Sequence, residues 1–314
     1  MLSWEQSAIL KISQSMLRSA RPPHTLPTGV ARALVPAGPG LISALVHCCA
    51  SIFILTASPA ARAQPDDRAW RNEIIQGLHA AGERDYPKAE QAFVQALKEA
   101  EHFGRDDTRV GSTLNSLGLV YRAEKKYSEA EAAYRRALVI MDAAYGDSVD
   151  VGNVNFNIAS VMFDQGHQVE AIPNLRTTLV IYERLLGSGS LKTAAALCME
   201  GDAYRMTHRY PESEDVLRRC ADIREMDSGL EDGSVADALH SLSLTLIAEG
   251  KFSAAEPRLR LAEKIREKTL GITSPLLAQT MEDHASVLKE LGRAKEAERL
   301  TTIAAAIPRS QKSK

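Results

Sequence analysis

The chain has 314 residues, of which 45% are hydrophobic, 25% charged and 5% aromatic, a composition that excludes wholesale disorder. Its 38 basic and 40 acidic residues give a formal net charge of -2, so the overall charge favours neither nucleic acid nor an anionic bilayer as a partner. Four cysteines without a C-x-x-C pair are too few for a disulfide scaffold and do not indicate zinc binding or thiol exchange.

Residues 1–63 have the features of an N-terminal export signal. An uncharged apolar run, LISALVHCCASIFILTA, occupies residues 41–57, and four basic residues but one acid precede it. Ala61-Arg62-Ala63 then supplies small residues at the two positions that a signal peptidase reads. We expect cleavage after Ala63 and a periplasmic or secreted protein. The alternative is a membrane-anchored envelope assembly factor, in which residues 41–57 are retained as a spanning helix in the inner membrane, although the run is shorter than the roughly 20 residues of such a helix.

The remainder of the chain is a repeated unit. Six segments align without a gap, beginning at Tyr86, Tyr127, Gln168, Tyr210, Phe252 and Ala294. Small residues recur within them at intervals of 41 or 42, at Ala89, Ala130, Ala171, Ser213, Ala255 and Ala297. A second small position follows at Ala96, Ala137, Thr178, Cys220, Ala262 and Ala304, and a third precedes the first at Gly77, Gly118, Ala159, Gly201, Ser243 and Ala285. Three small positions per unit predict close contacts between helices.

Apolar spacing within a unit is helical, as along Leu114, Leu117 and Tyr121. The second unit, with Gly118, Tyr121, Ala130, Tyr134 and Ala137 in phase, resembles the tetratricopeptide repeat family. That family's usual repeat has 34 residues, whereas the longer unit here is similar to the repeats of kinesin light chains and their bacterial relatives. The resemblance implies an all-α fold, a right-handed α-solenoid of about six helix pairs.

The predicted organisation follows from these alignments. Residues 1–63 are the export region, 64–69 a short linker, 70–307 the solenoid and 308–314 a basic tail. The six units lie near 70–110, 111–151, 152–193, 194–235, 236–277 and 278–307.

Nothing in the sequence indicates catalysis. No H-E-x-x-H, G-x-S-x-G, P-loop or G-x-G-x-x-G motif occurs, and no two histidines are spaced i, i+4 as metal ligands. The repeats also leave no room for a catalytic domain. We therefore expect a protein that is not an enzyme and has no catalytic residue, cofactor, metal or small-molecule substrate.

A partner-binding groove is the functional feature that the resemblance implies. The first helices of such units line a concave groove, and the matching positions are Asn115, Leu119, Arg122, Asn153, Phe156, Asn157, Ser160, Phe163, Asp202, Arg205 and His240. Asparagine amides can donate and accept at once, which suits the backbone of an extended peptide. Phe156 and Phe163 are the sharper candidates, unless they are ordinary packing between units. The expected partner is a protein or peptide, not nucleic acid, and a membrane only if the N-terminal segment is uncleaved.

Cys198 and Cys220 are the two cysteines that remain after cleavage. They fall at similar levels of the two helices of the fourth unit, but their phases point toward the groove and toward the next unit. A disulfide needs facing Cβ atoms. We expect two buried thiols by default, with an intramolecular bridge as the alternative.

Overall fold

The computed structural model describes residues 66–229 and 232–308, and every regular element in these two ranges is a helix. The predicted export region, and the basic tail apart from its first residue, lie outside the described residues. The helices, in chain order, are α2 (Arg68–Gly82), α3 (Tyr86–Glu101), α4 (Thr108–Ala123), α5 (Tyr127–Tyr145), α6 (Val149–Asp164), α7 (Gln168–Leu186), α8 (Leu191–Met206), α9 (Tyr210–Ser228), α10 (Gly233–Ala248), α11 (Phe252–Leu270), α12 (Pro275–Glu290) and α13 (Ala294–Ala306).

Consecutive helices pack as pairs, so α2 with α3 is the first unit and α12 with α13 the sixth. The small residues lie where the two helices of a pair touch, and Ala89, Ala130 and Ala255 are fully buried. A Cβ atom added at Gly118 would lie 2.6 Å from the Tyr134 ring. The predicted solenoid and its repeat phase are confirmed.

Side-chain caps fix where several first helices begin. Asp107, Ser148, Ser190 and Asp232 each accept a hydrogen bond from a backbone N–H in the first turn of the helix that follows. Such a cap satisfies a donor that the helix leaves unpaired, and typically contributes about 1 kcal/mol.

The turn within each unit needs a left-handed residue at one equivalent position. Glycine occupies it in three units, for example Gly166 with φ 84°. Arg84, Lys125 and His208 occupy it in the other three with φ of 62°, 61° and 60°. Because a Cβ atom disfavours this conformation, these three turns are strained relative to the glycine turns.

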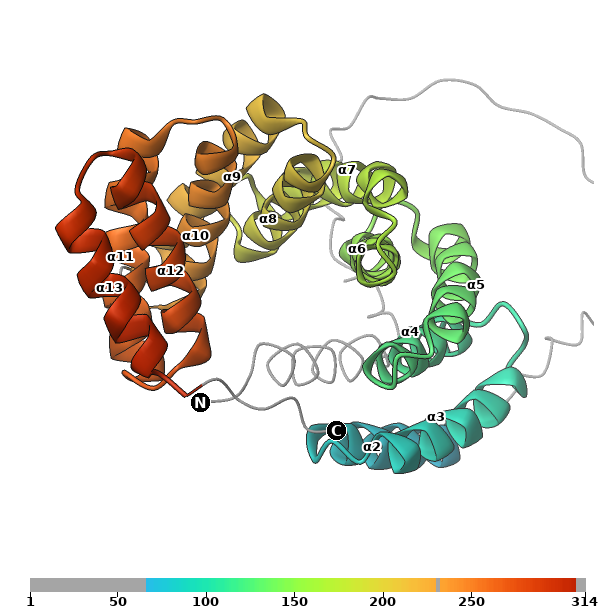
Figure 1. Cartoon of the computed structure of the whole chain (residues 1–314). Helices are drawn as coiled ribbons and strands as arrows, with labels where there is room; N and C mark the ends of the chain where they lie inside the picture. Colours follow the sequence, from blue (N-terminus) through green and yellow to red (C-terminus); the bar gives the residue numbers. More distant parts are fainter. Residues whose placement is uncertain (1–65, 230–231, 309–314) are drawn as a thin grey trace, which may run out of the picture.

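The units follow one another around an arc, with α6 on the inner side of α5 and α7 (Figure 1). Among the first helices, α4 contacts α6, and α10 contacts both α8 and α12. These five helices therefore present the concave face of the solenoid, and the second helices lie outside them. Within the described ranges, no helix has the length and apolarity needed to cross a membrane.

Candidate protein-binding face

Amide side chains on α4 and α6 form a hydrogen-bonded polar part of the concave face. Asn157 Nδ2 donates a 2.9 Å hydrogen bond to Asn115 Oδ1 in the preceding unit. Asn153 Oδ1, one helical turn from Asn157, accepts from the Tyr182 hydroxyl at 2.8 Å and from Lys192 Nζ at 2.6 Å. We call Asn115, Asn153, Asn157 and Lys192 the amide patch. It joins residues from the second, third and fourth units.

Lys192 is the member of the patch that sequence phase missed. It stands in the first turn of α8, ahead of the positions assigned to the groove, and its ammonium also lies 5.6 Å from the centroid of the Tyr182 ring. Little in the sequence indicates that Lys192 belongs to the face, because a single lysine at the start of a helix is common. Its hydrogen bond to Asn153 depends on how the third and fourth units are tilted together.

The predicted apolar positions are only partly available. Leu119 and Phe156 are half-buried against the main core, and Phe163 is half-buried against a small cluster that contains Ile172 and Tyr204. Ser160 is fully buried and donates to the Phe156 carbonyl oxygen at 2.9 Å. Ser160 therefore offers no surface to a ligand, whereas the two phenylalanines each keep an exposed part.

Two asparagines of the face differ in exposure from what their phase suggests. Asn115 has 7% of its surface exposed, so it acts chiefly by orienting Asn157. Asn155, which lies next to the predicted set, is buried and donates to the Val151 carbonyl oxygen of its own helix. That contact satisfies a structural need and leaves nothing for a partner.

Charged residues on the concave face are paired with each other. Arg122 contacts Asp164 at 2.6 Å, and Arg205 contacts Asp202 at 3.2 Å. His240 Nε2 lies 2.8 Å from Asp283 Oδ2 in the next unit. Burial raises the pKa of Asp202, although Arg205 and a hydrogen bond from Ser241 oppose that shift. All eleven predicted residues thus lie on first helices, and the amides gather in the second and third units whereas the ion pairs are spread from the second unit to the sixth.

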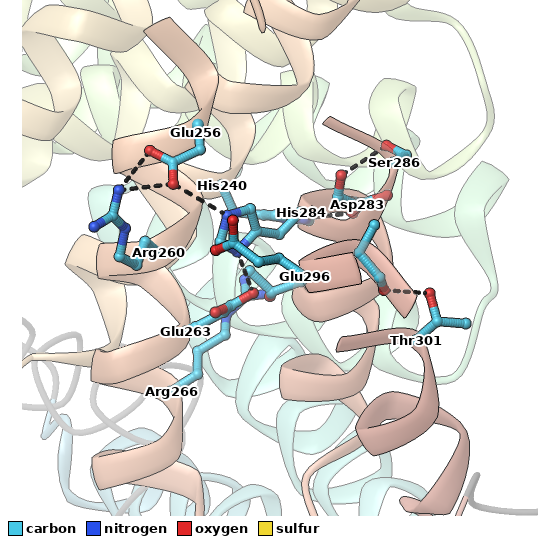
Figure 2. Close-up of polar contacts among 12 residues, drawn as sticks. His240, Glu256, Arg260, Glu263, Arg266, Asp283, His284, Ser286, Glu296 and Thr301 are labelled. Carbon is cyan, nitrogen blue, oxygen red and sulfur yellow. Dashed lines mark hydrogen bonds and ion pairs between the residues drawn. The ribbon is translucent and has the colours of Figure 1, made fainter. Parts of the chain in front are cut away.

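A second polar cluster lies between the last two units, where α11 faces α12 (Figure 2). His284 on α12 has 5% of its surface exposed; its Nδ1 atom lies 2.8 Å from Glu263 Oε1 and its Nε2 atom 3.6 Å from Glu256 Oε1. Glu256 also accepts hydrogen bonds from Arg260 and Arg293. We call these five residues the His284 network.

The central groups of the His284 network are buried and paired with one another. His284 and Glu256 are buried, and the Glu256 carboxylate is committed to two guanidinium groups. The network therefore joins the fifth and sixth units electrostatically. The repeat phase did not predict the His284 network, because the phase gives the backbone position of His284 but not its partners across the interface between units.

A cavity of about 360 Å³ opens between α9 and α11. Its floor includes Leu239 and Leu242 of α10, and its rim carries Asp222 and Arg258. In the described ranges, no group of three or more histidine, cysteine, aspartate or glutamate residues is placed to hold a metal ion.

The geometry defines a helical repeat solenoid, and comparison with known proteins assigns it to a family. Models of the tetratricopeptide repeat match residues 74–143, 150–226 and 235–276, so the chain belongs to the tetratricopeptide repeat family. It is a tetratricopeptide repeat protein of the kinesin-light-chain type.

Three individual proteins illustrate the likeness. The chain is 24% identical over 180 residues to Protein KINESIN LIGHT CHAIN-RELATED 2 of Arabidopsis thaliana, a match that covers 56% of this chain and 27% of that protein. The crystal structure of BtubC (BKLC) from P. vanneervenii aligns with a TM-score of 0.62 and 19% identity, over 73% of this chain and 96% of that one. A Rap protein complexed with competence and sporulation factor aligns with a TM-score of 0.51 and 18% identity, over 76% of each chain.

Proposed function

We propose that the protein is an exported, non-enzymatic scaffold that binds a peptide or a partner protein on its concave face. The single observation that carries this proposal is the amide patch, which spans three units and is held in place by side-chain hydrogen bonds. An ordered amide can pair with the backbone of an extended segment at a low entropic cost, because its side chain is already immobilised.

The half-buried aromatic residues complement the patch. Phe156 directly precedes Asn157 on α6, Phe163 lies almost two turns beyond Asn157, and both phenylalanines are half-buried. Aromatic side chains in such settings are frequent binding hot spots. A segment that pairs with Asn157 would place apolar side chains within reach of these rings. The Rap protein mentioned above, which has a similar fold, is itself complexed with competence and sporulation factor.

Two features support export. The apolar run at 41–57 and the Ala61-Arg62-Ala63 motif have the pattern of a cleaved leader. The structure also joins Cys198 to Cys220 in a disulfide, and such bonds persist mainly in oxidising compartments. The alternative, in which residues 41–57 remain as a membrane anchor, differs in mass: cleavage would give a chain that begins at Gln64, and mass spectrometry of the protein from intact cells would distinguish the two.

Site-specific photo-crosslinking in intact cells tests the binding face. A photoreactive amino acid replaces Asn157 on the concave face in one variant and Val139, 71% exposed on outer helix α5, in the control. We expect a discrete crosslinked partner from position 157 only. Phe163→Ala should lower the yield from position 157 at least several-fold while the far-UV circular dichroism stays unchanged. Equal yields from both positions would refute the proposed face.

A further inference from the structure

We propose that the Cys198–Cys220 disulfide is the condition for folding of the fourth unit, so that the concave face is continuous when the bridge is oxidised and divided when it is reduced. This inference rests on the proposed function, because it concerns the same face. The structure takes the alternative that the sequence left open: the two cysteines are bridged, with their Cα atoms 5.5 Å apart.

The first observation is that outer helix α9 has few fully buried apolar side chains, although Val216 and Ile223 are partly buried against the core. Its buried residues are Ser213, Leu217, Cys220 and Ala221, of which Leu217 alone is a large apolar side chain. Outer helix α7, by contrast, buries Ile172, Leu175, Leu179, Ile181 and Tyr182. Because burial of apolar area is the main favourable term in folding, α9 is held to its neighbours more weakly than α7.

The second observation is a set of polar substitutions at the repeat positions of α9. Arg224 stands where the two preceding units have the buried residues Met141 and Tyr182. Ser213 stands where all five other units have a buried alanine, and its hydroxyl is satisfied by the Gly201 carbonyl at 2.8 Å and by Thr245 Oγ1 at 2.8 Å. These hydrogen bonds offset the cost of burying the hydroxyl, but they do not supply the apolar packing that the other units have.

The third observation is where the bridge is placed. Cys220 is fully buried at the second small position of the repeat, and Cys198 lies half-buried on α8, at a position assigned to the concave face. The bridge therefore fastens the weakly packed outer helix directly to the helix that carries Asp202 and Arg205. It closes a segment with a sequence separation of 22 residues, and such a crosslink restricts the unfolded chain.

The consequence for the whole solenoid follows from its one-dimensional construction. Each unit contacts its neighbours only, so stability is a sum of unit and interface contributions. When an internal unit opens, both of its interfaces are lost. Opening of α8 and α9 would remove Lys192 from the amide patch, and it would separate Asn115, Asn153 and Asn157 from His240 and Asp283 in the fifth and sixth units.

The Cys198–Cys220 bond can form from the two thiols with an ordinary disulfide as the oxidant. A low-molecular-weight or protein disulfide accepts the two electrons and two protons of the Cys198 and Cys220 thiols by thiol–disulfide exchange, and leaves as two thiols. A chain held in a reducing compartment would keep its fourth unit open. Together with the predicted leader, the bridge would confine a continuous binding face to the exported protein.

Hydrogen exchange measured by mass spectrometry tests the proposal without a partner. The chain from Gln64 to Lys314 is compared with and without a phosphine reductant, beside the variant Cys198→Ala/Cys220→Ala. Alanine is a matched replacement at position 220, since Ala137 and Ala262 occupy the equivalent sites. On reduction we expect amides in 191–228 to exchange about tenfold faster, and amides of the second unit, 108–145, to keep their rates. The variant should exchange fast in 191–228 whether or not the reductant is present.

Three outcomes would overturn the proposal: unchanged exchange in 191–228 on reduction, a variant as protected as the oxidised protein, or equal acceleration in all six units. Because no partner is involved, this result is independent of the crosslinking experiment. Slow exchange after reduction, with crosslinking from position 157 intact, would reject the redox condition and leave the binding face standing. Fast exchange after reduction, with equal crosslinking yields from positions 157 and 139, would support the redox condition and reject the binding face.

Discussion

The close approach of α4 and α5 gives a substitution whose effect can be estimated from the structure. Gly118 lies on α4 opposite Tyr134, whose side chain is fully buried. The methyl group of Gly118→Ala would lie 2.6 Å from Tyr134 Cε1 and 2.8 Å from Cδ1 and Cζ. Carbon atoms pack at about 3.5–4.0 Å, so the ring or one of the helices must move by nearly an ångström.

Two opposing terms decide the sign of the change in unfolding free energy. Replacing glycine by alanine inside a helix favours the helix by about 1 kcal/mol. Inserting a methyl group into a filled core costs about 1–3 kcal/mol, and the upper part of that range applies here because the Tyr134 ring is enclosed on all sides. We expect a net destabilisation of about 1–2 kcal/mol. For a chain of this length that corresponds to a fall in Tm of about 2–8 °C.

Thermal unfolding followed by far-UV circular dichroism measures this change, and Gly82→Ala is the matched control. Gly82 ends α2, is exposed, and has nothing within 4 Å of an added Cβ atom. The same substitution there should raise the Tm slightly, because the helix propensity acts alone. The double variant Gly118→Ala/Tyr134→Leu should lose less stability than the two single variants added together. A Tm for Gly118→Ala at or above that of the wild type would refute the packing of the second unit.

Three further predictions use the same unfolding assay. Lys125→Gly should raise stability by up to about 1 kcal/mol, because glycine relieves the left-handed turn at φ 61°; an unchanged or lower Tm would contradict the strain. Ala130→Leu should lower it by about 1–3 kcal/mol, since that side chain is fully buried, and a wild-type Tm would contradict the repeat phase. Burial by itself would raise the pKa of the Glu256 carboxyl, but hydrogen bonds from Arg260 and Arg293 outweigh that effect, so the pKa is lowered in the folded protein. The carboxylate therefore stabilises the fold above the unfolded pKa of 4.5, and this contribution disappears as the pH falls through the lower pKa of the folded protein. Between about pH 5 and 3, Glu256→Gln should therefore lose less stability than the wild type.

The architecture was predictable because it follows from properties that repeat. A small residue every 41 or 42 positions fixes where two helices touch, and helical spacing of apolar residues fixes which sides they bury. The phase also placed the eleven predicted residues on first helices. It did not identify the strained turns at Arg84, Lys125 and His208, since the glycine that marks this turn in the other three units is missing there.

Contacts between units were less predictable, because they depend on the tilt of one helix pair against the next. Lys192 reaches Asn153 across 39 positions, and His284 reaches Glu263 across 21. Neither distance is set by the repeat period. The disulfide belongs to the same class: the phases of Cys198 and Cys220 pointed apart, yet their Cα atoms lie 5.5 Å apart, within the range that a bridge requires.

Residues of one phase can still differ in what they offer a partner, because the side chains packed around them differ. Leu119, Ser160 and Asp202 occupy the same position in three consecutive units, and the sequence assigned all three to the binding face. Leu119 and Asp202 are half-exposed, whereas Ser160 is fully covered and its hydroxyl donates a hydrogen bond to a carbonyl oxygen of its own helix. Phase therefore locates a backbone position on the concave face, but only the side chains packed around that position determine whether a ligand can touch it. On this reasoning Asn157, which is oriented by Asn115 and remains half-exposed, is a better probe of binding than Ser160, although both lie on the concave side of α6.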